Sequence, residues 1–448
     1  MRSVARLAPF ALLAALGIAA YANSIDGAFV WDDNILIADN PVVKSWSTVP
    51  ALSAKGFVVP RYVKEGLLYR PIEMITYIAD YSIGGSYPPT YHITNLIFHI
   101  LSSFAVFMLV SVLYRDTALA VFTGALFTVH PALTEAVSYI SGRSDVLAAL
   151  FMLAALLFYI RSLDGGPVPL ALACALFVSA LLSKEVSIIF PALIMVYHYS
   201  SSRKARIRMM APFLAAAAVY VLFAVKFLNA APPDVSIFCR NAIERVPGFF
   251  AALSGYLRLL VAPSGLHMDY GNARFNFTDW RVMSGAAVFI FFILCAVTLR
   301  RISSGRFTFG LLWFLVALVP YSGIYPSSDF MAERRLYLPS IGFFLVTASF
   351  FRAVYGLKRA RAATTIAFCA ILVVLLRLTI FQNISWKDPV DFYERTLLYS
   401  PGSVRANLDL ALIYERKGQH AEVVEIYREL LKSGDPMLKK LIEERLKQ

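Results

Sequence analysis

The sequence is short of charge. Only 16% of its 448 residues are Asp, Glu, Lys or Arg, against about 25% in an ordinary soluble domain, while 58% are hydrophobic. A single core cannot bury that much apolar surface, so the composition excludes a soluble globular protein and also a disordered chain. What remains is an all-α protein that crosses a membrane many times. Its apolar runs are continuous and do not alternate as the strands of an outer-membrane barrel do.

Other features are missing as well. The four cysteines imply no disulfide framework, because three of them lie inside apolar runs. No GxxxxGK[ST] or GxGxxG loop is present, so we expect no nucleotide-driven chemistry. The net charge of +13 comes with no nucleic-acid module. It lies before residue 384, where it suits membrane topology and contact with anionic lipid, and no nucleic acid is expected as a partner.

Eleven apolar runs are predicted to span the membrane, near residues 7–21, 91–113, 117–133, 146–162, 168–182, 186–200, 209–229, 282–299, 308–325, 336–351 and 363–381. A twelfth run, 249–262, is short and contains Arg258. With eleven spans the N-terminus and the basic loops near Arg203, Arg300 and Arg359 share the cytoplasmic side, whereas a twelfth crossing would turn two of these loops outward. We therefore predict that 249–262 is an interfacial or re-entrant helix on the outer face.

The first run has a second interpretation. It follows Arg2 and Arg6 and ends in Ala20-Tyr21-Ala22, a pattern typical of a signal-peptidase site. We favour an uncleaved first span. In both interpretations the basic start stays inside and Asp32 emerges outside.

The last 65 residues differ in composition, with 11 basic and 11 acidic side chains. Their spacing is typical of a tetratricopeptide hairpin preceded by half a repeat. The residues concerned are Tyr393, Pro401, Asn407, Leu410, Ala411, Tyr414, Gly418, Val423 and Tyr427. We predict a short tetratricopeptide-type region at 383–448, on the outer side, that can bind a protein partner. The alternative is a plain charged pair of amphipathic helices docked on the membrane part.

Ionisable side chains beside spans are costly in lipid and therefore indicate function. In the eleven-span topology they gather on the outer side. Asp32 and Asp33 form an adjacent acidic pair that can supply a general base, or oxygen ligands if a divalent cation binds. Four cations can hold a phosphate leaving group: Arg143, Lys184, Arg334 and Arg335. Seven further side chains are expected to support the pocket: Tyr69, Arg70, His130, Glu135, Asp145, Glu185 and Glu333.

A carboxylate base beside a phosphate clamp at a lipid surface suits transfer of a group from a lipid-linked phosphate, such as an inverting sugar transfer. Each motif also has a structural interpretation. Asp32-Asp33 can be a turn and helix cap, Lys184-Glu185 a loop ion pair, and Arg334-Arg335 a headgroup anchor. A transport path is disfavoured, because it needs ionisable groups near the midplane and on both faces.

Seven motifs follow one another along the chain: FVWDDN at 29–34, YRP at 69–71, YHITNLIFH at 91–99, LFTVHPALTEAV at 126–137, GRSD at 142–145, KE at 184–185 and AERRLYLPS at 332–340. In this order they resemble the TMTC family, the transmembrane and tetratricopeptide-repeat O-mannosyltransferases of the GT-C superfamily. The resemblance covers nearly the whole chain. It implies a GT-C-like glycosyltransferase domain over 1–382. The eleven-span topology gives this domain a first outer loop at 24–89 and an outer loop at 230–281 that carries the interfacial helix.

The resemblance also implies a chemistry. The donor is a polyprenyl-phosphate sugar, with mannose expected, and the acceptor is a Ser or Thr hydroxyl of a protein, or a glycan. The family's acidic pair maps onto Asp32 and Asp33, which makes them the expected catalytic residues. The repeat array is much shorter than in eukaryotic members, which suggests a prokaryotic relative that uses undecaprenyl phosphate.

The expected location is a bacterial cytoplasmic membrane with a periplasmic active site and C-terminus, or the endoplasmic reticulum membrane if the source is eukaryotic. The rival class is a non-enzymatic anchored scaffold whose C-terminal helices recruit an extracytoplasmic partner.

Overall fold

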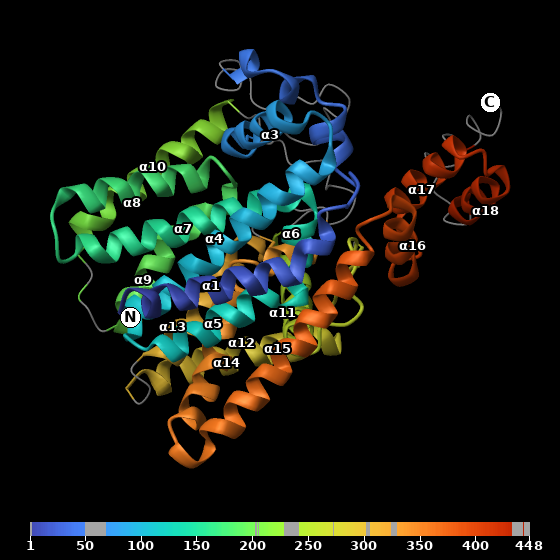
Figure 1. Ribbon diagram of the computed structural model, residues 1–448. Coiled ribbons are helices and arrows are strands. Elements are labelled where there is room, and N and C mark those ends of the chain that lie inside the picture. The colour runs from blue at the N-terminus through green and yellow to red at the C-terminus, as the bar shows by residue number, and fades with distance from the viewer. Residues whose placement is uncertain are drawn as a thin grey trace.

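A computed structural model describes residues 2–49, 69–201, 204, 206–227, 242–271, 273–301, 305–323, 329–431 and 442. Within these ranges the regular structure is exclusively helical (Figure 1). Three predicted features lie partly outside the described residues: the middle of the first outer loop, the start of the outer loop at 230–281, and the basic loop near Arg203.

Within the described residues, each of the eleven apolar runs overlaps an α-helix of the structure. These helices are α1 (Arg2–Tyr21), α4 (Pro88–Tyr114), α5 (Thr117–Val129), α7 (Arg143–Ser162), α8 (Pro167–Leu181), α9 (Phe190–Ser201), α10 (Ile207–Phe227), α12 (Trp280–Thr298), α13 (Arg306–Leu318), α14 (Ser340–Tyr355) and α15 (Arg361–Ile384).

Among the described residues, six helices are long and apolar enough to cross a membrane: α1, α4, α7, α10, α12 and α15. A seventh crossing results if α5 and the bent segment Pro131–Ser138 after it are taken together. Helices α8, α13 and α14 are apolar but shorter. The chain is therefore a polytopic helical membrane protein, as expected, and the number of eleven crossings stays a prediction.

The helices run between two ends of the bundle. At one end α1, α6 (Thr134–Ser138) and α15 meet, because Asn383 donates to the carbonyl of Ala20 at 2.8 Å and accepts from Ser138 at 2.8 Å. We call this the polar end. At the other end Arg352 pairs with Asp116 at 2.6 Å, joining the loop before α5 to the last turn of α14.

Helix α11 (Ala242–Val261) begins and ends at the polar end. Arg245 in its first turn lies against Gly323, which follows α13, and the carbonyl of Leu260 in its last turn accepts from His130 at 3.1 Å. Its middle packs closely on α12, since a Cβ on Gly285 would overlap the Phe250 carbonyl. This helix contains residues 249–261 of the run 249–262, for which an interfacial position is predicted.

Small residues let α13 and α14 pack backbone to backbone. A Cβ on Gly342 would overlap the carbonyl oxygen of Gly310, so neither position has room for a side chain. Close approach of this kind replaces the hydrophobic driving force that is missing between helices in lipid. Nearby, the fully buried Trp313 donates to the carbonyl of Leu338 at 2.9 Å. These contacts fix the loop that precedes α14.

Three C-terminal helices stand outside the bundle at the polar end (Figure 1). They are α16 (Pro389–Tyr399), α17 (Val404–Arg416) and α18 (His420–Leu431). The predicted hairpin is present as α17 and α18, which bury Ala411, Val423, Tyr427 and Leu430 in one cluster. Its assignment as a tetratricopeptide repeat stays a prediction.

Replacing Asn383 with Ala tests the junction of α1, α6 and α15. The change removes three hydrogen bonds of 2.8 to 2.9 Å from a fully buried side chain and leaves their partners unsatisfied. We expect a loss of stability of about 2–5 kcal/mol, seen as a lower unfolding temperature in detergent. The control is Asn276→Ala, because Asn276 is exposed. Equal unfolding temperatures for the two variants would show that the junction does not contribute to stability.

Candidate active site

The two adjacent carboxylates have different surroundings. Asp33 is fully buried, where its Oδ1 accepts from the amide and hydroxyl of Ser141 at 2.8 and 2.5 Å and its Oδ2 accepts from the Val30 amide at 3.2 Å. Burial raises the pKa of Asp33 to about 7, although the bonds from Ser141 and Val30 act against this rise. The Asp32 side chain is 39% exposed and its Oδ1 lies 2.6 Å from Nη2 of Arg405. Asp32 is therefore the carboxylate that a substrate can reach.

Arg143 lies beneath this region and is fully buried. It pairs with Asp80 at 2.6 Å, donates to Asn95 at 2.6 Å, and also bonds Thr76 and the carbonyl of Tyr91. Its guanidinium carbon lies 4.7 Å from the centroid of the Tyr77 ring. The structure thus places Arg143 away from the open face, where it joins α3 (Pro71–Gly84), α4 and α7.

Other predicted residues form a row of ion pairs across the polar end. Arg70 makes two bonds to Glu185, at 2.9 and 3.1 Å, and Lys184 lies 2.5 Å from Asp145. Arg334 pairs with Glu135 through both its side chain and its amide. Burial lowers the pKa of Lys184, while Asp145 acts in the opposite direction. Each of these cations is already paired with a carboxylate, so an incoming phosphate has to compete with that carboxylate for the cation.

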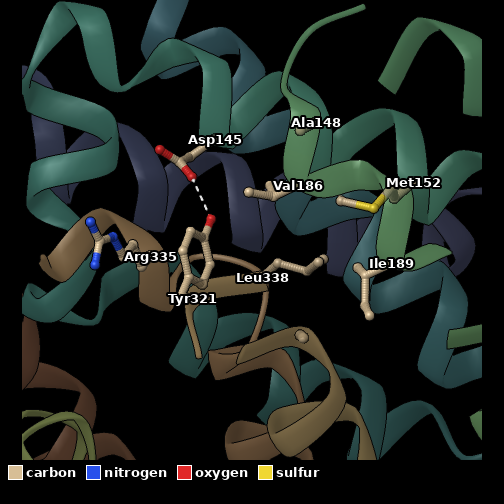
Figure 2. A pocket seen from close by; sticks show the side chains of 9 residues that line it. Asp145, Ala148, Met152, Val186, Ile189, Tyr321, Arg335 and Leu338 are labelled. Carbon is tan, nitrogen blue, oxygen red and sulfur yellow. Dashed lines mark hydrogen bonds between the residues drawn. The ribbon is translucent and has the colours of Figure 1, made fainter. Parts of the chain in front are cut away.

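A small cavity of about 10 Å³ opens beside this row (Figure 2). Asp145, Tyr321 and Arg335 lie on one side of it, and the Tyr321 hydroxyl is 3.5 Å from Oδ1 of Asp145. Arg335 donates to the carbonyl of Asp329 at 3.0 Å. The remaining lining is apolar and comes from Ala148, Met152, Val186, Ile189, Ala317 and Leu338. The cavity thus has one polar side and one apolar side, and its volume is about that of one water molecule.

Three predicted supporting residues have mainly structural contacts. Glu333 is buried and accepts from the amide of His267 at 2.7 Å and from the hydroxyl of Tyr270 at 2.5 Å, and burial together with Glu135 raises its pKa well above its ordinary value. His130 is buried against α11. Tyr69 packs on the ring of Phe223 of α10, with centroids 5.0 Å apart.

Sequence reasoning missed several groups around Asp32. Tyr139 accepts a hydrogen bond from the Asp32 amide at 3.2 Å, and Arg405 comes from α17. The counter-ion of Arg143, Asp80, was missed as well. The aromatic position at 139 lies next to a motif and could have been noted, but nothing in the sequence connects Asp32 with a residue 373 positions away.

The described residues do not fit a metal centre around the acidic pair. No group of three His, Cys, Asp or Glu side chains within the described part of the chain converges on one point. The carboxylate of Asp33 already accepts three hydrogen bonds, which a cation would have to displace. Asp32 alone offers too few ligands for a divalent cation. We therefore derive no step through a metal.

No protein-family model matches the chain. It is 25% identical to the protein O-mannosyl-transferase F38B6.6 of Caenorhabditis elegans, over 91% of this chain and 60% of the relative. It is 26% identical to the human protein O-mannosyl-transferase TMTC1, over 94% of this chain and 54% of the relative. The chain thus spans between half and two thirds of the length of these relatives. The resemblance to the TMTC O-mannosyltransferases is confirmed as a distant homology over about 93% of the chain.

Two solved structures are similar at 14% identity. One is ArnT from Cupriavidus metallidurans bound to undecaprenyl phosphate, with a TM-score of 0.47 over 90% of this chain and 79% of that one. The other is the oligosaccharyltransferase of Archaeoglobus fulgidus tethered to an acceptor peptide, with a TM-score of 0.47 over 93% of this chain and 58% of that one.

The buried carboxyl of Asp33 predicts a pH dependence of stability. Its pKa is about 7 in the folded chain and near 3.8 when it is unfolded, so the folded state binds the proton more tightly. This stabilisation is complete below pH 4 and is lost as the pH rises through 7. Between about pH 5 and pH 7 we expect the free energy of unfolding to fall by about 2 kcal/mol, and Asp33→Asn should abolish this fall.

The measurement is the unfolding temperature in detergent across that pH interval. The control is Asp26→Asn, because Asp26 is exposed in the same segment. If Asp33→Asn keeps the pH dependence of the wild type, the assignment of this titration to Asp33 is wrong.

Proposed function

We propose that this distant homologue of the TMTC O-mannosyltransferases transfers a sugar from a polyprenyl phosphate to a hydroxyl acceptor outside the membrane. One observation carries the proposal. The carboxylate of Asp32 is partly exposed at one end of the helical membrane bundle. The ion pairs of Lys184 and Arg334 lie at the same end, next to a cavity with polar residues on one side and apolar residues on the other. A base, a phosphate site and a lipid site at one membrane surface are the parts that this reaction needs.

The proposed topology has eleven crossings in a GT-C-like arrangement. The basic residues Arg206, Arg300 and Arg352 lie at the end opposite to Asp32, as shown by the contacts of Arg206 with Leu163, of Arg300 with Tyr199 and of Arg352 with Asp116. The positive-inside rule makes that end cytoplasmic. The polar end, α11 and the C-terminal helices then face outward, with α11 along the membrane surface.

The donor lipid is placed with its chain on the apolar wall and its phosphate near Arg335, Arg334 and Lys184. Because the cavity is small, its walls have to separate when the donor enters. The phosphate would take over hydrogen bonds that Asp145 and Glu135 now accept. Arg143 is not included in this clamp, since its side chain is fully buried and bonded to Asp80 and Asn95.

The transfer step uses Asp32 as the base. The acceptor oxygen forms a bond to the anomeric carbon of the sugar while the bond from that carbon to the phosphate oxygen breaks. The hydroxyl proton moves to the Asp32 carboxylate, and the phosphate leaves with the bonding electron pair. The cations stabilise the charge that develops on the leaving phosphate. Attack from the side opposite the leaving group inverts the anomeric configuration.

The finer assignments rest on the relatives. Their names, protein O-mannosyl-transferases, support mannose as the sugar and a protein Ser or Thr as the acceptor. We further propose undecaprenyl phosphate as the carrier and a bacterial cytoplasmic membrane with a periplasmic site. The C-terminal helices are available to bind a protein partner.

The base assignment is tested with Asp32→Asn. Purified protein in nanodiscs receives radiolabelled polyprenyl-phosphate mannose and a lysate of a deletion host as acceptor source. We expect label transfer by the wild type and a loss of about 100-fold or more in Asp32→Asn, because general-base catalysis contributes 10²–10⁴-fold. The control, Asp26→Asn, should behave as the wild type. Full activity in a folded Asp32→Asn variant would exclude this mechanism.

A wild type that transfers no sugar from a panel of lipid-linked donors would favour the scaffold. That alternative predicts instead that the C-terminal helices retain a binding partner irrespective of Asp32.

The phosphate clamp is tested with Arg335→Gln. Removing one charge-assisted hydrogen bond should weaken binding of the polyprenyl-phosphate donor by about 10- to 100-fold and raise the donor KM. The control is Arg281→Gln, because Arg281 is half-exposed and contacts Asp279 and the ring of Phe275, both close to it in the sequence. Donor binding is measured by titration of polyprenyl phosphate against protein in nanodiscs. An unchanged KM in Arg335→Gln would remove this residue from the clamp.

A further inference from the structure

The C-terminal helices contact the first outer loop at Asp32. Arg405, near the start of α17, places Nη2 at 2.6 Å from Oδ1 of Asp32, and its guanidinium carbon lies 4.1 Å from the centroid of the Trp31 ring. Its Nε is 3.6 Å from Oδ2 of Asp409, one turn further along the helix. The ring and the two carboxylates together hold the guanidinium in one direction. A cation held in this way can in turn orient the carboxylate that it contacts.

The backbone that carries Asp32 is strained. Trp31 has a φ of 54°, in the left-handed region that a bulky side chain rarely adopts. The hydroxyl of Tyr393, from α16, accepts from the Trp31 amide at 3.2 Å, and the hydroxyl of Tyr139 accepts from the next amide, that of Asp32. Strained conformations persist where the surroundings fix them from several sides. One of the contacts that fix this turn, the bond to Tyr393, comes from helices α16–α18, which we call the C-terminal unit.

The C-terminal unit is also anchored independently of Asp32. Ser400 and Ser403 donate to the carbonyl and the carboxylate of Asp269, each at 2.5 Å. Arg395 donates to the carbonyl of Leu266 at 3.0 Å and to the side chain of Gln382 at 2.8 Å. These bonds tie the unit to the outer loop at 230–281 and to α15. Arg405 therefore belongs to a docked body, and the unit cannot swing away as a lid without breaking them.

We infer that the C-terminal helical unit is part of the active site, in which Arg405 and Tyr393 are positioning residues for Asp32. The inference rests on the proposed function and deepens it. A general base has to be ionised and aimed at the acceptor proton, a task for which catalytic sites use a third group beside the base. Arg405 fixes Oδ1 of Asp32, and Tyr393 fixes the turn through the Trp31 amide. The other oxygen, Oδ2, takes the proton.

Stability is a poor explanation for the Arg405–Asp32 pair. Both side chains are 39% exposed, and ion pairs in such surroundings contribute little to folding. If Arg405 had only a structural role, its pairing with Asp409 on the same helix would be enough, and a contact with Asp32 would not be needed. The effect of removing Arg405 should therefore appear in the transfer step and in the order of the turn, and hardly in the unfolding temperature.

The test compares Arg405→Gln, Arg405→Lys and Tyr393→Phe with Arg416→Gln. Arg416 lies exposed on the same helix and serves as the matched control. We expect kcat to fall about 10- to 100-fold in Arg405→Gln with little change in donor KM, partial recovery in Arg405→Lys, and wild-type values in Arg416→Gln. An Arg405→Gln variant with a kcat within twofold of the wild type would overturn the inference.

Hydrogen exchange separates failure of the inference from failure of the proposed function. Amides 31 and 32 should exchange faster in Arg405→Gln and Tyr393→Phe than in Arg416→Gln, with or without a working transfer assay. Unchanged exchange in both variants would overturn the inference. Faster exchange together with a wild type that transfers no sugar would overturn the proposed function and leave the docking intact.

Discussion

The carboxylate of Asp33 holds the first outer loop onto the membrane part. It is taken fully out of water and accepts hydrogen bonds from its own turn and from the segment before α7. A buried carboxylate is costly unless it is satisfied, so these bonds determine the path of the turn. Because side chains of neighbouring residues diverge, the fixed orientation of Asp33 turns Asp32 toward solvent. The two residues of the acidic pair thus have different roles: Asp33 holds the loop and Asp32 faces solvent.

The same division recurs among the cations. Arg143 and Arg334 both lie inside motifs with several polar residues, yet Arg143 is enclosed by α3 and α4 while Arg334 stays 22% exposed at the mouth of the bundle. Low dielectric strengthens the bonds of the enclosed group and makes them costly to break. The Lys184–Asp145 pair at the cavity is buried as well, whereas Arg334 is partly exposed and can be approached by a competing anion. Arg143 therefore has a structural role inside the bundle, and Arg334 remains accessible at its mouth.

Much of the fold could be predicted from the sequence because lipid leaves the chain few choices. Continuous apolar runs have to form helices in lipid, and all eleven runs overlap helices in the part of the chain that the structure describes. The gathering of Arg70, Glu135, Asp145, Lys184 and Glu185 followed from their places beside the runs. The pairings did not, since Arg334 and Glu135 are 199 residues apart and no local pattern links them. Arg405 was missed because the residue spacing in α17 identifies the buried positions of the helix. It gives no information on the contacts of a charged side chain on the other face.

Helices α8 and α13 have 15 and 13 residues, so they measure only about 22 and 20 Å along their axes, less than the roughly 30 Å of a bilayer's hydrocarbon layer. Helix α4, with 27 residues, reaches about 40 Å. The two short helices end beside Lys184 and Tyr321, next to the cavity. If both helices cross the bilayer, as in the proposed eleven-span topology, local thinning of the bilayer is one way to relieve this mismatch. Lipid headgroups on this flank would then lie at the level of the cavity rim, and the proposed donor could present its phosphate there by lateral diffusion, without rising out of the leaflet.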